Sequence, residues 1–141
     1  MGKLFLQKKN IMTAFLIFIV SYTILDAIHD FCFANNITIK LLKSQYRIWH
    51  TIDAVIKLLV IAAIGHFSIN PIIYDIKDIF YLSFIFASIR WVLHDLTYNL
   101  IAGKKWYYIG SGGIDIVLMH WQIFPKILFL FLSSFLIFQY Y

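Results

Sequence analysis

Charge is scarce in this chain of 141 residues, of which 13% are charged against roughly 25% in an average soluble domain. There is no glutamate, so all seven acids are aspartates, while 62% of the residues are hydrophobic and the mean hydropathy is +0.81. This composition excludes an ordinary water-soluble domain. The formal net charge of +5 is spread along the chain, so the sequence indicates no nucleic-acid partner.

Cysteine is almost as rare, and the single Cys32 excludes an intramolecular disulfide and a C-x-x-C motif for thiol redox chemistry or zinc binding. The N-terminus carries Lys3, Lys8 and Lys9 ahead of an apolar stretch, as a secretory signal does, but no small-x-small cleavage site follows. We therefore expect an uncleaved first membrane helix.

Long apolar stretches dominate the remainder of the chain. A bilayer core of about 30 Å requires about 20 residues of helix, and four stretches meet that length: 11–34, 46–69, 79–102 and 112–139. The breaks between them are rich in Asn, Pro, Gly and Lys. The sequence predicts an all-α protein of one domain, an integral membrane bundle of four transmembrane helices in which consecutive helices are antiparallel neighbours.

The two faces of this bundle are called side A, which carries the N-terminus, and side B, which carries the first and third connections. Loop lysines and arginines divide four to side A and five to side B, so the positive-inside rule gives no decisive orientation. The basic N-terminus favours side A in the cytoplasm. The expected partners are membrane lipids, and assembly with further copies of the chain stays open.

Aspartate and histidine gather in one half of the predicted membrane region. Because consecutive helices alternate in direction, the ends of the first and third stretches and the starts of the second and fourth meet at side B. Nine such residues fall there: Asp26, His29, Asp30, His50, Asp53, His94, Asp95, Asp115 and His120. Lys57 and Arg90 lie deeper, about 16–18 Å from side B at 1.5 Å per residue.

Helical spacing divides these residues into stripes. The stripes are Tyr22, Asp26, His29 and Asp30; then His50, Asp53 and Lys57; then Ser83, Ala87, Arg90 and His94, with Asp95 and Asn99 one step round; and Asp115, Gln122, Lys126 and Ser133. His120 lies off the last stripe and is discounted. Five aspartates against Lys57 and Arg90 leave three negative charges, which metal, protons, a cationic substrate or water must balance.

One interpretation is a metal-dependent membrane enzyme acting on lipid-like or small substrates. Imidazole and carboxylate at helical spacing suit zinc, iron or manganese. The candidate ligands are His29, Asp30, His50, Asp53, His94 and Asp95, and the candidate catalytic residues are Asp26, Asp53 and Asp95. No fixed metal-binding signature is present, and haem is less favoured because so many carboxylates lie nearby.

Two non-enzymatic interpretations compete with it. In the first, the polar residues only hold helices together: Asp53 pairs with Lys57, Arg90 neutralises Asp26 or Asp53, and Asp115 favours the start of its helix. Lys57, Arg90, Asn99 and Asp115 then have structural or charge-balancing roles. In the second, the same Asp and His residues form a proton or ion pathway. The sequence is thus compatible both with an enzyme and with a non-enzymatic membrane protein.

A pattern of residues runs through 90–115: Arg90-Trp91, Asp95, Asn99, Gly103, Trp106, Tyr108-Ile109-Gly110 and Asp115. It resembles uncharacterised small multi-pass membrane proteins of Bacteroidetes and their phages. The resemblance implies a bacterial inner membrane, or a host membrane for a phage protein, and no particular activity. In that family the residue before the aspartate is usually aromatic, so His94 departs from the pattern. This weakens His94 as an essential ligand and gives more weight to Arg90, Asp95, Asn99 and Asp115.

Overall fold

The computed structural model describes residues 2–41, 44–69, 75–105 and 124–140. Four helices and one short hairpin lie within them: α1 (Gly2–Ala34), β1 (Thr38–Leu41), β2 (Ser44–Arg47), α2 (Ile48–Ile69), α3 (Ile76–Ile101) and α5 (Phe124–Tyr140). The helical prediction is confirmed, and the first three expected stretches end close to helix ends. The fourth stretch is described only from Phe124 on, so Asp115 and His120 lie outside the described residues.

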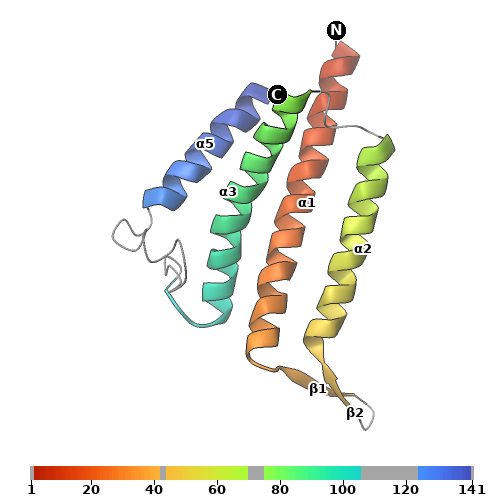
Figure 1. Cartoon of the computed structure of the whole chain (residues 1–141), viewed down its shortest axis with the longest axis vertical. Coiled ribbons are helices and arrows are strands. Elements are labelled where there is room, and N and C mark those ends of the chain that lie inside the picture. The colour runs from red at the N-terminus through yellow and green to blue at the C-terminus, as the bar shows by residue number, and fades with distance from the viewer. Residues whose placement is uncertain (1, 42–43, 70–74, 106–123, 141) are drawn as a thin grey trace.

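The helices stand side by side in the order α5, α3, α1, α2 (Figure 1). The main packing pairs are α1 with α2, α1 with α3, and α3 with α5. The described helices thus form a row with α1 and α3 in its middle, where a closed bundle was expected. α1 and α3 run in the same direction, so the principal neighbour of α3 is a parallel helix and not the preceding α2.

The parallel pairing of α1 and α3 is visible in the contacts between their polar residues. Asp26 meets Arg90 and Asp30 meets His94, each at a separation of 64 residues in the chain. Since both pairs advance by four residues, the two helices run parallel and in register along one stripe each. Electrostatic complementarity between these stripes, which loop length does not predict, accounts for the packing of α3 on α1 where the antiparallel neighbour α2 was expected.

α1 and α3 end in the same way, at the breaks that the sequence predicts. Asn36 and Gly103 adopt positive φ angles of 47° and 67°. The next residue in each case, Ile37 or Lys104, donates its backbone N–H to a carbonyl five residues earlier, at 3.0 and 2.8 Å. These are Schellman motifs, which satisfy the last helical carbonyls and turn the chain out of the helix.

The start of α3 is equally well defined. Asp75 caps it by accepting a hydrogen bond from the backbone of Lys77, and the side chain of Asp78 accepts one in return from the backbone N–H of Asp75. This capping box satisfies helical N–H groups that have no intrahelical partner. Both acids lie at side A, remote from the side B aspartates.

A small antiparallel hairpin joins α1 to α2, pairing Thr38 with Arg47 and Leu41 with Ser44. The sequence predicts only a connection between two helices here, because strands of four residues give no clear alternation of polar and apolar residues. The hairpin continues the chain past the side B ends of α1 and α2 (Figure 1). It turns the chain back so that α2 runs antiparallel to α1.

Two of the described helices are long and apolar enough to cross a membrane: α1, over Asn10–Ala34, and α2. α5 contains a shorter apolar segment, Phe124–Gln139. α3 has the length to span, at 26 residues, but carries charged residues along it and is not among these candidates. α2 has no buried residue, and Leu58, Ile61 and Ile64 are each more than 60% exposed. Such an apolar surface fits contact with lipid acyl chains.

Candidate functional site

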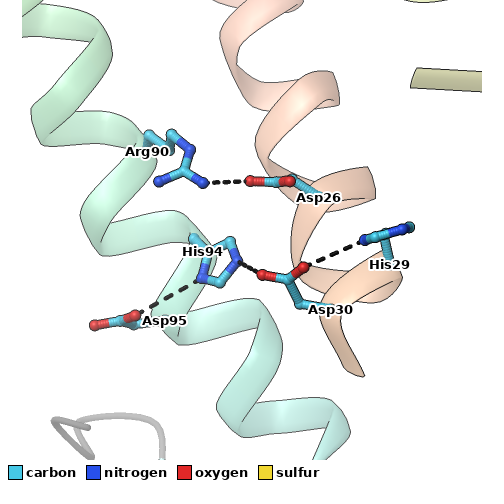
Figure 2. A network of polar contacts seen from close by, with 6 residues as sticks. All are labelled: Asp26, His29, Asp30, Arg90, His94 and Asp95. Carbon is cyan, nitrogen blue, oxygen red and sulfur yellow. Dashed lines mark hydrogen bonds and ion pairs between the residues drawn. The ribbon is translucent and has the colours of Figure 1, made fainter. Parts of the chain in front are cut away.

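The polar residues of α1 and α3 face one another in the half of the molecule toward side B (Figure 2). The deepest pair joins Arg90 Nη2 to Asp26 Oδ2 at 2.5 Å. The carboxylate of Asp26 is 17% exposed, whereas the Arg90 side chain is 41% exposed. Arg90 therefore covers and neutralises a nearly buried carboxylate, which is one of the two partners that the sequence proposes for it.

One turn closer to side B, Asp30 lies between two imidazoles (Figure 2). Its Oδ1 is 3.2 Å from His29 Nδ1, and its Oδ2 is 3.2 Å from His94 Nε2. Both contacts are within hydrogen-bond distance for an imidazole that carries a proton on the facing nitrogen. His94 thus bridges α3 to α1 through Asp30.

The same histidine reaches a second carboxylate on its other side. His94 Nδ1 is 3.8 Å from Asp95 Oδ1, and the other oxygen of Asp95 accepts a hydrogen bond from Lys126 Nζ at 2.7 Å. Lys126 belongs to α5, and its side chain is 6% exposed. The result is a continuous line of polar contacts across α1, α3 and α5, namely His29, Asp30, His94, Asp95 and Lys126.

Lys126 has a role in this network that was not predicted from the sequence. Its ammonium lies 5.9 Å from the ring centroid of Trp91 as well as against Asp95. The polar stripe of the fourth stretch includes Lys126, but the charge balance above omits it because its position near the middle of that stretch indicates no partner. Its i to i+7 spacing from Ser133, which is also buried, is the signal that could have marked it as interior.

The polar residues of α2 stand apart from this line. Asp53 accepts a hydrogen bond from Lys57 at 2.7 Å, and both side chains are exposed, at 37% and 70%. His50 stacks on Trp49 with ring centroids 3.6 Å apart. Within the described residues no hydrogen bond or ion pair joins His50 or Asp53 to α1 or α3. The self-contained pair of Asp53 and Lys57 is as predicted.

The six predicted metal ligands accordingly separate into two groups. His29, Asp30, His94 and Asp95 come together, whereas His50 and Asp53 remain on α2. In the part of the chain that the structure describes, no three His, Cys, Asp or Glu side chains converge as the ligands of one ion would. Asn99 is buried on α3. The expectation of zinc, iron or manganese stays a prediction, and these side chains give it no assembled site.

Lys126 changes the charge balance of the predicted cluster. Across α1, α3 and α5 the contacting acids are Asp26, Asp30 and Asp95, and the cations of fixed charge are Arg90 and Lys126. Arg90 takes Asp26 and Lys126 takes Asp95, so one negative charge remains, at Asp30. The groups that contact Asp30 are two histidines, the side chains whose charge changes near neutral pH.

A half-open groove of about 420 Å³ lies along one face of α3 beside this network. Its lining residues share a helical face: Phe86, Ala87, Arg90, Trp91, His94 and Asp95. Phe86 and Ala87 lie at the deeper end, His94 and Asp95 lie toward side B, and Arg90 and Trp91 lie between them. His94 therefore contacts Asp30 on one side and lines the groove on the other.

Neither a protein-family model, nor a curated protein sequence, nor a solved structure matches this chain. The resemblance to small membrane proteins of Bacteroidetes and their phages thus stays a hypothesis.

Proposed function

We propose that this protein is a multi-pass membrane protein whose side B network binds and relays protons. The observation that carries the proposal is the negative charge at Asp30, held between His29 and His94, with which no lysine or arginine of the described α1, α3 and α5 pairs. The Asp30 side chain is 49% exposed, and a carboxylate between two imidazoles can share a proton with them. Sharing one proton among Asp30 and its two histidines makes the α1, α3 and α5 network neutral.

The arrangement of the contacts supports relay as well as binding. His94 has one ring nitrogen near Asp30 and the other near Asp95, at 3.2 and 3.8 Å. An imidazole can accept a proton at one nitrogen and release it from the other. Protons can therefore pass between α1 and the groove without any large movement of a side chain.

The membrane setting of the proposal rests on α1 and α2, which have the length and hydropathy of membrane spans. We include α3 and α5 as further spans because ion pairs between helices neutralise their charged residues. Paired charges facing a bundle interior are far less costly than single charges facing lipid. By the resemblance above, the membrane is a bacterial inner membrane or the membrane of a phage host.

Liposomes test the proposal directly. Purified protein is reconstituted around a pH-sensitive dye, potassium and valinomycin hold the membrane potential near zero, and the decay of an imposed pH gradient is followed. We expect the wild type to dissipate the gradient, and Asp30→Asn and His94→Gln each to slow it by at least about tenfold, since neither replacement side chain exchanges a proton near neutral pH. Liposomes as tight as protein-free ones would contradict the relay.

The matched control is Asp75→Asn, the same change at the side A end of α3. Asparagine is as good an N-cap as aspartate, so the start of α3 is preserved while one acid is lost. Asp75 lies outside the proton network, and proton flux should be unchanged. Equal losses in Asp75→Asn and Asp30→Asn would show that the loss of any acid has the same effect, which contradicts a specific site at Asp30.

A further inference from the structure

The groove on α3 changes in chemical character along the helix. Phe86 and Ala87 form its deeper end, Arg90 and Trp91 form its middle, and Asp95 lies at the end toward side B. From the middle of α3 toward side B, the lining is therefore apolar, then cationic, then anionic. A zwitterionic phospholipid in the side B leaflet has complementary groups in the same order, namely its acyl chains, its phosphate and its ammonium.

Arg90 has hydrogen-bond donors that a phosphate can use. Its guanidinium carries several N–H groups in a planar fork, and among the described residues it makes one hydrogen bond, from Nη2 to Asp26. The side chain lines the groove and is 41% exposed. Because guanidinium groups bind phosphate oxygens through parallel pairs of hydrogen bonds, the remaining donors of Arg90 suit the phosphate of a lipid.

Asp95 has an acceptor for an ammonium at the outer end of the groove. It points away from α1, whereas Arg90 points toward α1 (Figure 2). Its Oδ2 accepts the hydrogen bond of Lys126, and its Oδ1 lies 3.8 Å from His94 Nδ1, which is longer than an ordinary hydrogen bond. Oδ1 can therefore accept a hydrogen bond from a ligand in the groove while Lys126 stays in place.

The fixed charges at the groove form a dipole without a net charge. Arg90 is matched by Asp26, and Asp95 is matched by Lys126. A zwitterion aligned with this dipole keeps the balance, whereas an anion or a cation would add an uncompensated charge in a region of low dielectric. The Lys126 ammonium already lies 5.9 Å from the Trp91 ring centroid. That contact disfavours a quaternary ammonium, which depends on aromatic ring faces, and favours a primary ammonium that hydrogen-bonds to Asp95.

The depth of the polar end fits a headgroup. Asp95 precedes Ile101, the last residue of α3, by six residues. Asp26, the partner of Arg90, precedes the last residue of α1, Ala34, by eight. At 1.5 Å per residue these acids lie about 9 and 12 Å from the helix ends at side B. With the helix ends in the headgroup layer, which is about 6 Å thick, a bound headgroup lies several ångströms below its neighbours.

The size and shape of the groove fit part of a lipid. Its volume of about 420 Å³ is in the range of sites for small organic molecules. It holds a headgroup and the first carbons of the chains. Because the groove is half-open, the chains can continue past Phe86 and Ala87 along α3 into the bilayer.

We infer that the groove on α3 binds a zwitterionic phospholipid with a primary ammonium, phosphatidylethanolamine, whose phosphate contacts Arg90 and whose ammonium contacts Asp95. The inference goes beyond the proton relay and does not depend on it, because no side chain has to change its protonation state. Lipid binding is expected whether or not the protein conducts protons, so the liposome experiment above and the binding experiments below can fail independently.

Short-chain lipids test the inference on the full chain in detergent. Dihexanoyl phosphatidylethanolamine is titrated by calorimetry beside the phosphatidylcholine, whose ammonium donates no hydrogen bond, and the phosphatidylglycerol, which is an anion. We expect phosphatidylethanolamine to bind at least about tenfold more tightly than either, since it alone makes both charge-assisted hydrogen bonds. Equal affinity for the three lipids, or a preference for phosphatidylglycerol, overturns the inference.

Glycerophosphoethanolamine, the same headgroup without acyl chains, distinguishes a lipid from a soluble ligand. It should bind at least about tenfold more weakly than the lipid, because it buries no apolar surface against Phe86 and Trp91. An affinity equal to that of the lipid would mean that the groove is a site for a soluble phosphate ester, which contradicts a lipid site.

A variant that fills the groove places the ligand. Ala87→Leu alters no charge and should weaken phosphatidylethanolamine by at least about tenfold, because a branched side chain then occupies the apolar end of the groove. The matched control is Ala54→Leu, at an exposed alanine of α2 outside the groove, where binding should be unchanged. Unchanged binding in Ala87→Leu, or an equal loss in Ala54→Leu, rules out the groove as the lipid site.

Two double variants place the headgroup. Each replaces a whole ion pair and leaves no carboxylate unpaired: Asp26→Asn with Arg90→Met, and Asp95→Asn with Lys126→Met. The first should weaken all three lipids, because each has a phosphate, and the second should reduce phosphatidylethanolamine to the affinity of phosphatidylcholine. Affinity that survives the first double variant contradicts the contact with Arg90. A preference for phosphatidylethanolamine that survives the second contradicts the contact with Asp95.

Discussion

α2 and α3 both pack against α1, and they handle their charges in opposite ways. α3 directs Arg90 and His94 at the aspartates of α1, so its charged residues are satisfied only when the helices are together. α2 satisfies its charged residues internally, with Lys57 on Asp53 one turn away. Aromatic rings mediate much of its contact with α1, including Phe67 against Phe15 and Trp49 against Phe33.

The difference predicts which contacts define the structure. A charged residue that needs a partner on another helix fixes rotation and register, because a slip of one residue separates the pair. A charge pair within one helix forms wherever that helix packs, so it does not fix the rotation or register of the helix. On this basis α1, α3 and α5 form the specific unit of the described chain, and α2 is held by apolar and aromatic contact.

The largest loss of stability is expected for Lys126→Met. Methionine preserves most of the side-chain volume but leaves Asp95, 26% exposed, without its ammonium partner, and removal of one member of a buried pair costs about 3 kcal/mol. Chemical denaturation in detergent, followed by circular dichroism, measures it. Asp95→Asn combined with Lys126→Met should recover most of the loss, and failure to recover would indicate that packing of Lys126 matters more than its charge.

Arg90→Met should cost less, about 2 kcal/mol, because the Arg90 side chain is 41% exposed and water partly screens the pair. The free energy of unfolding in detergent is again the readout. The double variant Asp26→Asn with Arg90→Met should lie close to the wild type, since no carboxylate is left unpaired. If Arg90→Met unfolds as the wild type does, Asp26 is hydrated and α3 is not held by this pair.

Much of this arrangement was predictable from sequence. Helix bounds follow from apolar runs and from turn residues such as Asn36 and Gly103, whose positive φ angles suit helix ends. The pair of Asp53 with Lys57 follows from spacing, whereas charge alone left the partner of Arg90 open between Asp26 and Asp53. The packing of α3 on α1 and the partner of Lys126 could not be predicted, because both depend on which helices are neighbours. Short connections favour helices that are consecutive in the chain.

Lys57→Gln is expected to have the smallest effect, below about 0.5 kcal/mol, which is typical of exposed pairs one helical turn apart. Both members are exposed, so water or lipid headgroups replace the lost partner of Asp53. Measured beside Arg90→Met, this variant removes the same charge on the opposite side of α1. A loss as large as that of Arg90→Met would mean that Asp53 is buried in an assembled form of the protein, and that α2 belongs to a polar interface with another chain.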